Sequence, residues 1–530
     1  MLQMFYQTVV ASALFYAVVC WGGSIKRKDA SRLDKLVWKA SSIVGMELDS
    51  LTSVAERRAL SRLLSIMENP LHPLNSIISR QKSSFSDRLL SLSCSTDRLR
   101  FLSLAHNKIE RLPKDLKNWL HLETFSVENN KLTSVPFSIQ SLQNLRSLNL
   151  NNNGISHLPN EICYLKNLKQ MYLSQNQLVQ LPTAFGDLAA LEVLGISANK
   201  LTFLPKSMAN LKNLHILNLD SNHFSYFPRE ICCLANLIKL SLSGNRLVSL
   251  PKEVSEMVNL RELSLNENKL TFLPRQLFDL SNLEELSLHG NHLTALSGEI
   301  KKLQELRVLN VSKNRISVVT EGISDCRNLR RLSLRENQIS CLPLGIGALT
   351  NITELLVDEN LLENLPEGIK CTLLTAVDLS SNRLLRIPLG ICSLVTLRHL
   401  NLSCNSVCEA MEDIAYLTNL QHLELSSNKM TIFPLQICKL QNLQYLDLSN
   451  NLIERIPTEI MDLKNIEVLL LQKNKLPIFP TALCHLNSLL VLDLTDNQVS
   501  HIPIQVSFII QQCSISSICL TKWPVVITST

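Results

Sequence analysis

The chain has 530 residues and a formal net charge of +6; 45% of its residues are hydrophobic, 5% are aromatic and 14 are glycine. Such a length suits several ordinary domains or one long repeat array. Residues 1–98 hold 13 Lys and Arg against 8 Asp and Glu, so residues 99–530 carry a net charge of only +1. This near neutrality argues against broad electrostatic binding of nucleic acid by the long C-terminal part.

The chain begins with an apolar stretch that contains no charged residue before Lys26. Met4 to Trp21 has 18 residues, which is the lower limit for a transmembrane helix, and the basic run at 26–28 would then lie on the cytoplasmic side. A secretion signal is disfavoured, because such signals begin with basic residues. Two interpretations stay open: a membrane anchor with the rest of the chain in the cytosol, or a buried helix.

Two amphipathic helices are predicted after this stretch. Residues 29–45 carry apolar side chains at helical spacing, and residues 53–69 begin with Ser53 and Glu56, the spacing of a capping box. Prolines at 70 and 73 end the second helix. We expect residues 1–98 to form a small helical module with a basic surface, which makes nucleic-acid binding through these helices an alternative function.

The stretch VVCWGGSIKRKDASRLDKLVWKASSIVGMELDSLTSVAERR, followed by NPLHP and RLLSLSCSTDRLR, resembles the extreme C-terminal region of reverse transcriptases from fish LINE-type retrotransposons. The similarity runs from about Met1 to Arg98. It implies a transposon fragment joined to a repeat protein. Polymerase activity is not implied, because no Asp-Asp dipeptide occurs in the chain to supply the metal-binding carboxylates.

From residue 99 onward one pattern, LxxLxLxxNxLxxLPxxIxxL, returns every 23 residues, with a single step of 22 between Asn360 and Asn382. It predicts 18 repeats between about Leu99 and Val506. Six residues after the Asn stands Pro in 15 of the 18 repeats, and the exceptions are Ser297, Thr320 and Met411. The repeated Asn occupies positions Asn107, Asn130, Asn153, Asn176, Asn199, Asn222, Asn245, Asn268, Asn291, Asn314, Asn337, Asn360, Asn382, Asn405, Asn428, Asn451, Asn474 and Asn497.

The residue types of the repeat predict its shape. The alternating leucines, such as Leu148 and Leu150, point inward from a short strand, and strands of successive repeats lie side by side in a parallel sheet. The Asn amide bonds backbone groups of its own turn and of the next coil. Because Pro fixes φ and lacks an N–H, the outer segment is extended or a short 3₁₀ turn rather than a full helix. Nine residues after the Asn, an apolar residue fills the coil from the convex side: Leu116, Ile139, Ile162, Phe185, Ile231, Ile346 and Ile460.

These motifs resemble leucine-rich repeats, specifically the 23-residue intracellular type of Erbin, Scribble and Ras suppressor protein, over about residues 99–506. The order of the repeats is also similar to leucine-rich-repeat and death-domain-containing proteins. The resemblance implies an α/β solenoid: a horseshoe with a concave parallel β-sheet and short 3₁₀ or extended convex segments. It also implies a non-enzymatic cytoplasmic scaffold for intracellular signalling, whose partner is a protein such as a small GTPase or a phosphatase subunit.

The step of 22 residues arises within EGIKCTLLT, where Ile369 and Leu374 stand one residue closer than in the other repeats. The deletion falls on the convex side. We therefore expect the strand and the Asn turn to survive, with a small change of curvature.

The concave face is the expected binding surface, with exposed positions six, four, two and one residues before each Asn. At the ends of the array these positions are small and polar, and toward the middle they become charged, which suits recognition of a folded protein by charge complementarity. The candidate partner-binding residues are Lys239, Glu262, Asn266, Glu285, His289, Arg331, Arg335, Glu354, Asp358, His399, His422, Glu424 and Tyr445.

His399 and His422 occupy the same position in adjacent repeats, so we expect their side chains about 5 Å apart, one strand spacing. Such a pair could share a metal or respond to pH, with Glu424 nearby, but two solvated histidines are the favoured interpretation. Cys404 and Cys408 form a CxxxC pair without a second pair, which is a weak metal signal. We therefore predict no metal site and no cofactor.

The cysteines indicate reduced thiols. Of the 15 in the chain, several recur at one position of the repeat, as small half-buried residues would: Cys163, Cys232, Cys392, Cys438 and Cys484. No cluster of cysteines caps the array, whereas secreted arrays usually carry disulfide caps, so a cytosolic setting is expected.

No catalytic motif is present: the chain lacks a glycine-rich phosphate loop, H-E-x-x-H and G-x-S-x-G. An enzyme is not expected. Residues 507–530 are apolar and aperiodic and are predicted to form an irregular tail, because a terminal cap needs a polar outer face. We expect the native protein to continue in a different way, with a death domain or another module.

Overall fold

The computed structural model describes residues 99–409 and 412–501. Several predictions from the sequence lie outside these residues: the possible anchor Met4–Trp21, the helical and reverse-transcriptase-like segment 1–98, and the tail 507–530. Position 411, which breaks the proline pattern, is also outside.

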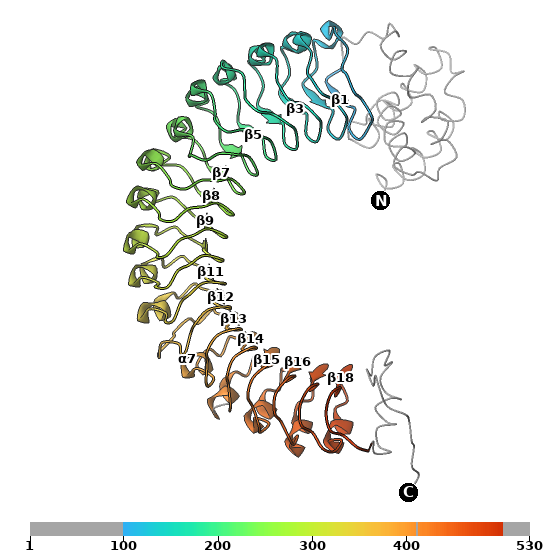
Figure 1. Ribbon diagram of the computed structural model, residues 1–530, viewed down its shortest axis with the longest axis vertical. Helices are drawn as coiled ribbons and strands as arrows, with labels where there is room; N and C mark the ends of the chain where they lie inside the picture. The colour runs from blue at the N-terminus through green and yellow to red at the C-terminus, as the bar shows by residue number, and fades with distance from the viewer. Residues whose placement is uncertain (1–98, 410–411, 502–530) are drawn as a thin grey trace, which may run out of the picture. The chain divides into compact units, whose positions relative to one another are not determined.

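The described residues form one parallel sheet of 18 strands, in which each strand pairs with the strands of the preceding and following repeats. The sheet lines the inner side of a curved array of coils (Figure 1). Every strand has three residues: β1 Phe101–Ser103, β2 Thr124–Ser126, β3 Ser147–Asn149, β4 Gln170–Tyr172, β5 Val193–Gly195, β6 Ile216–Asn218, β7 Lys239–Ser241, β8 Glu262–Ser264, β9 Glu285–Ser287, β10 Val308–Asn310, β11 Arg331–Ser333, β12 Glu354–Leu356, β13 Ala376–Asp378, β14 His399–Asn401, β15 His422–Glu424, β16 Tyr445–Asp447, β17 Val468–Leu470 and β18 Val491–Asp493.

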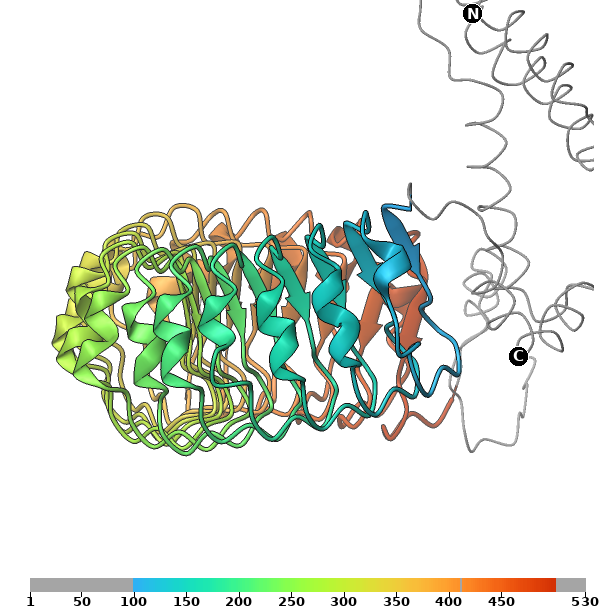
Figure 2. The same cartoon turned by 90° about the horizontal axis from the view of Figure 1, so that it is seen from above.

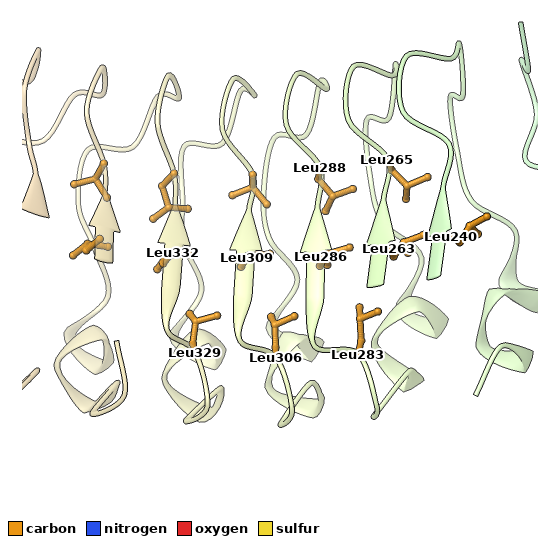
Figure 3. Close-up of a cluster of buried hydrophobic side chains, with 14 of the residues drawn as sticks. Leu240, Leu263, Leu265, Leu283, Leu286, Leu288, Leu306, Leu309, Leu329 and Leu332 are labelled. Atoms are coloured by element: carbon orange, nitrogen blue, oxygen red, sulfur yellow. The ribbon is translucent and has the colours of Figure 1, made fainter. Parts of the chain in front are cut away.

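The predicted alternation of side chains in the strands is confirmed. In β10, Leu309 is fully buried between the half-buried Val308 and Asn310, and Val311 just beyond the strand is buried again. The leucines of successive repeats form rows that run across the strands (Figure 3). Each coil therefore completes the apolar interior of its neighbours, which is why the array is stable only as a stack.

The repeated asparagines join successive coils. Asn291 donates from Nδ2 to the carbonyls of Leu288 and His289 in its own turn, at 3.0 and 3.4 Å, and to Leu265 O at 2.9 Å. Its Oδ1 accepts the N–H of Leu270 at 3.0 Å. Leu265 and Leu270 belong to the preceding repeat, so the prediction that the amide reaches the next coil is wrong in direction. The Asn side chain therefore points toward the coil that precedes its own turn, where a backbone N–H and a carbonyl lie within hydrogen-bond distance.

The residue before each of these asparagines adopts a left-handed conformation. Its φ lies between 49° and 68° in all 18 repeats, and only Gly244 and Gly290 are glycines there. L-residues rarely occupy this region, so the turn holds a strained residue in nearly every repeat. The buried Asn side chain that follows is what keeps the turn closed.

Short 3₁₀ turns form the convex side, as predicted from the prolines. In most repeats the Pro is the N-cap, with extended φ and ψ. Ser297 and Thr320 replace it by accepting the N–H of the second turn residue on their hydroxyls. The turns are η3 Lys117–Trp119, η4 Phe137–Ser141, η5 Asn160–Tyr164, η6 Phe185–Asp187, η7 Lys206–Asn210, η8 Arg229–Cys233, η9 Lys252–Glu256, η10 Arg275–Asp279, η11 Gly298–Lys302, η12 Glu321–Asp325, η13 Leu344–Ala348, η14 Glu412–Tyr416, η15 Leu435–Lys439, η16 Thr458–Asp462 and η17 Thr481–His485.

The apolar residues predicted to fill the coils from the convex side are buried, from Leu116 in the first coil to Ile460 near the end. Cys163, Cys232, Cys392 and Cys438 are also buried rather than half-buried, and only Cys484 is intermediate. The core is continuous through the described repeats. Burial of apolar surface between neighbours is thus the main source of stability.

The shortened repeat keeps its strand and its Asn turn, as predicted. Asn382 still accepts the N–H of Leu362 and donates to Val357 O, both at 3.0 Å. No 3₁₀ turn forms there; a tight bend with Gly368 at φ +82° replaces it, and the next coil carries one turn of α-helix, α7 (Leu389–Cys392). Gly390 lets the coils close, because a Cβ at this position would lie 2.8 Å from Pro366 O.

No helix among residues 99–409 and 412–501 has the length and apolar character needed to cross a membrane.

Candidate functional site

The predicted partner-binding residues lie in three groups on the concave face. Those of β7 to β9 form the first group, those of β11 and β12 the second, and those of β14 to β16 the third. Positions six and four before the Asn flank the central apolar residue of each strand, and position two comes after the next apolar residue beyond the strand. Whether these residues bind a partner stays a prediction. Their surroundings show which side chains are available for binding.

Many charges on this face neutralise one another between adjacent strands. Lys239 of β7 pairs with Glu262 of β8, and Arg331 of β11 pairs with Glu354 of β12, where Nε and Oε2 lie 2.5 Å apart. The hydrogen bond to Glu262 raises the pKa of Lys239, and the bond to Glu354 raises the pKa of Arg331. Identical positions in successive repeats are one strand spacing apart, which is salt-bridge distance for such side chains.

Asp358 is not an exposed contact residue, which corrects the prediction from the sequence. It is 2% exposed, and Arg335 Nε donates to its Oδ2 at 2.9 Å. Its Oδ1 has no hydrogen-bond partner in the described part of the chain. Burial, followed by the nearby Asp378, raises the pKa of this carboxyl group. The side chain is short and stays close to the sheet, so its neighbours cover it.

Asn266 and His289 already have partners within the array. Asn266 Oδ1 accepts from Ser287 Oγ at 2.7 Å and from the His289 N–H at 2.9 Å. The His289 ring lies 3.2 Å from Glu267. Glu285, in contrast, is exposed and forms no ion pair with another described residue. It is therefore the carboxylate of this group most available to a partner.

Three rings line adjacent strands β14 to β16. The ring centroids of His399 and His422 lie 5.7 Å apart, close to the predicted spacing. His422 stacks flat on Tyr445, with centroids 3.9 Å apart and planes inclined by 7°. His422 Nε2 also lies 2.9 Å from Glu424 Oε1. The sequence placed all three rings six residues before their Asn, but the stacking of His422 on Tyr445 was not anticipated.

The environment of the two histidines differs. Burial, then His422 and Arg398, lower the pKa of His399. In the described residues, no group of three or more His, Cys, Asp or Glu side chains is placed to hold a metal ion. The cysteines there are free thiols, and both Cys404 and Cys408 are exposed. The three rings thus form a partly exposed row on the concave face.

Three family profiles match the chain. Residues 138–222 and 206–321 match the leucine-rich repeat region, residues 441–499 match the leucine rich repeat, and residues 418–460 match two copies of leucine rich repeats. Among curated proteins, none matches the chain.

Solved structures extend the similarity to most of the array. A leucine-rich-repeat protein of Leptospira interrogans is 32% identical with a TM-score of 0.58, over 81% of this chain and 98% of that one. The plant peptide hormone receptor RGFR1, solved with RGF2, is 27% identical with a TM-score of 0.63, over 79% of this chain and 74% of the receptor. YopM from Yersinia enterocolitica, at 23% identity and a TM-score of 0.56 over 81% of this chain and 98% of that one, shares the fold.

The chain is thus a solenoid repeat protein with a parallel inner sheet, and it belongs to the leucine-rich-repeat family. This fold is consistent with protein–protein interaction, and the RGFR1 structure is one complex in which such an array meets a second molecule.

Proposed function

We propose that this chain is a non-enzymatic cytoplasmic scaffold that binds a folded partner protein on its concave face. The observation that supports this most strongly is the row of His399, His422 and Tyr445, which presents three rings side by side on a rigid sheet. Aromatic side chains held in place before binding contribute strongly to protein interfaces, because little conformational freedom is lost when they are covered.

The charges of the concave face favour a folded partner with charges of both signs. Glu285 lacks an ionic partner among the described residues, while Lys239 and Arg331 are held by neighbouring carboxylates. Side chains fixed in this way fit a surface of defined shape. The resemblance to Ras-pathway repeats supports a small GTPase or a phosphatase subunit as the partner, and the free thiols support the cytoplasm.

The test compares Tyr445→Ala with Tyr416→Ala. Tyr416 lies on the convex turn η14 and is exposed, so it is a matched control. Partners recovered with the full chain, and purified small GTPases and phosphatase catalytic subunits, are then titrated by calorimetry. We expect Tyr445→Ala to weaken binding about tenfold or more, as for a central interface residue, and Tyr416→Ala to leave it unchanged.

Glu285→Lys provides a second test on the first group. We expect it to weaken the same complex, because it reverses an exposed charge that forms no salt bridge with another described residue. Arg335 is unsuitable for such a test, because its removal would leave the buried Asp358 unpaired and destabilise the array. A complex that is insensitive to both concave variants but lost with Tyr416→Ala would place the site on the convex side.

A further inference from the structure

One flank of the array carries an unusual concentration of positive charge over repeats β5 to β8. The chain leaves each Asn turn at the arrowhead end of a strand and crosses this flank to the convex turn (Figure 3). In four consecutive repeats the crossing segments read KLTFLPK (200–206), HFSYFPR (223–229), RLVSLPK (246–252) and KLTFLPR (269–275). They contain seven Lys and Arg and no Asp or Glu. We call these four segments the basic flank.

The core fixes the direction of the side chains on the basic flank. In the first segment Leu201 and Leu204 are buried and anchor the chain, so Lys200, Phe203 and Lys206 face outward. The same three positions are exposed in the second and fourth segments, where the first position of the second segment is His223. In the third segment the two outer positions are exposed, but the central one is the half-buried Ser249. Three of the four segments therefore place a ring between two rows that hold the seven Lys and Arg side chains. The rings are 55% exposed at Phe203, 78% at Tyr226 and 58% at Phe272.

The cations of the basic flank have no ionic partners among the described residues. The opposite edge of the sheet differs, because there the charges pair along the array: Lys169 with Glu192, and Arg261 and Arg307 with Glu284. Acidic residues do follow the basic flank on the convex turns: Glu230 and Glu253 are half-buried, Glu256 is exposed and Asp279 is paired with Lys302, and none of them forms a salt bridge with the basic flank. The positive charge therefore remains available to an external anion.

The basic flank is flat and its rings protrude from it. The loops of successive repeats lie nearly level along both sides of the array (Figure 2). Strand spacing gives a length of roughly 15 Å along the four repeats, and an extended crossing segment separates the two cation rows by up to ~20 Å. A patch with these dimensions is too wide for one nucleic-acid strand to contact both rows. Rings that project from a flat cationic surface fit a bilayer interface, which deforms around them while its phosphates meet the cations.

We propose that the basic flank docks on a membrane that carries anionic phospholipids. Lys and Arg would bind the headgroups, and Phe203, Tyr226 and Phe272 would enter the interface. The concave face would then stand at the side of the contact and stay open to a partner. This proposal does not depend on the identity of that partner.

The test is co-sedimentation of the full chain with phosphatidylcholine vesicles that contain phosphatidylserine, compared with vesicles of phosphatidylcholine alone. We expect retention on the anionic vesicles that falls as salt rises. Lys252→Glu with Arg275→Glu should lower the partition coefficient about 25-fold or more, since each basic residue contributes about fivefold. Phe203→Ala with Phe272→Ala should lower it severalfold without changing the charge.

The matched control is Lys439→Glu with Lys464→Glu, which changes the net charge equally at two exposed convex positions. It should retain most of the binding. Circular dichroism checks that each variant is folded. Since all variants keep residues 1–98, an equal loss in both charge-reversal variants, or no loss in either, would overturn the proposal.

A single-stranded oligonucleotide serves as the competing ligand. If the full chain binds oligouridylate but not the anionic vesicles, and the Lys252→Glu with Arg275→Glu variant loses that binding, the basic flank is a nucleic-acid site and the membrane proposal is wrong. Failure to bind either kind of vesicle in low salt also contradicts it.

Discussion

At the scale of single residues, the left-handed residue before each Asn is the most strained feature of the repeat. Gly244 is at this position in its repeat, with φ +67°. A Cβ added to Gly244 would lie 3.1 Å from Ser221 Oγ. We predict that Gly244→Ala destabilises the array by about 1 kcal/mol, because an L-residue is disfavoured at positive φ and its Cβ crowds Ser221. Guanidinium unfolding followed by circular dichroism measures the change.

Gly195 provides the control for this prediction. It lies in β5 at an ordinary φ, and an added Cβ would find its nearest neighbour at 3.5 Å. Gly195→Ala should therefore be neutral or stabilising, since Ala restricts the unfolded chain without strain. If both substitutions destabilise the array equally, the positive φ of Gly244 is not the reason for the loss of stability at that position.

The hydrogen bonds of the repeated asparagines can also be tested by single substitutions. Asn291 is buried and makes four hydrogen bonds to backbone groups of two coils. We predict that Asn291→Ala costs about 2–4 kcal/mol, because it leaves these buried groups without partners. Replacing the exposed Asn282 by Ala should lower the free energy of unfolding much less, because Asn282 Nδ2 donates only to Val258 O. Denaturant unfolding that fails to separate the two variants would contradict this role.

At the scale of elements, neighbouring strands couple side chains that are 23 residues apart. His399 and His422 illustrate this, because burial and then the charge of His422 lower the pKa of His399. A base whose pKa is lowered by folding has no effect on stability well above its ordinary value of 6.5, where it is neutral in both states, and it penalises folding as the pH falls below that value. Acidification should thus weaken the array around β14.

We predict that His422→Asn raises the pKa of His399 toward its ordinary value without restoring it fully, because the burial of the ring remains. An NMR titration of the histidine Cε1 protons measures this. Lys429→Asn is a suitable control, since Lys429 is not among the groups that shift the pKa of His399. If His399 titrates identically in wild type and His422→Asn, the two rings are not coupled across the strands.

At the scale of the whole molecule, the continuous core divides the thiols into two classes. Burial raises the pKa of Cys163 to about 11 and that of Cys438 to about 12, whereas Cys341 and Cys404 are exposed. We predict that a disulfide reagent labels the exposed thiols in the native array within the mixing phase and the buried ones only after unfolding. Mass spectrometry of labelled peptides distinguishes the two classes, and rapid labelling of Cys438 in the native array would contradict the described packing.

The repeat spacing was enough to predict the parallel sheet, the short convex turns and the survival of the strand and Asn turn in the shortened repeat, because each of these depends on residues within one repeat and its neighbour. The loss of the 3₁₀ turn in that repeat was not predicted. The candidate site was less predictable. Asp358 shares its position with exposed residues of other repeats, yet it is buried beside Arg335. The outcome at such positions depends on the lengths and charges of side chains in adjacent coils, which the repeat pattern does not specify.

The sequence by itself determined that this protein is a stack of 18 similar coils, since Leu, Asn and Pro at fixed spacing impose the same strand, turn and convex segment each time. Only the tertiary structure decided which surface groups remain available. It paired Arg331 with Glu354, stacked His422 on Tyr445 and left the cations of the basic flank without ionic partners in the described chain. The physical reason is that stacking brings residues of successive repeats to within one strand spacing, where their charges and rings interact.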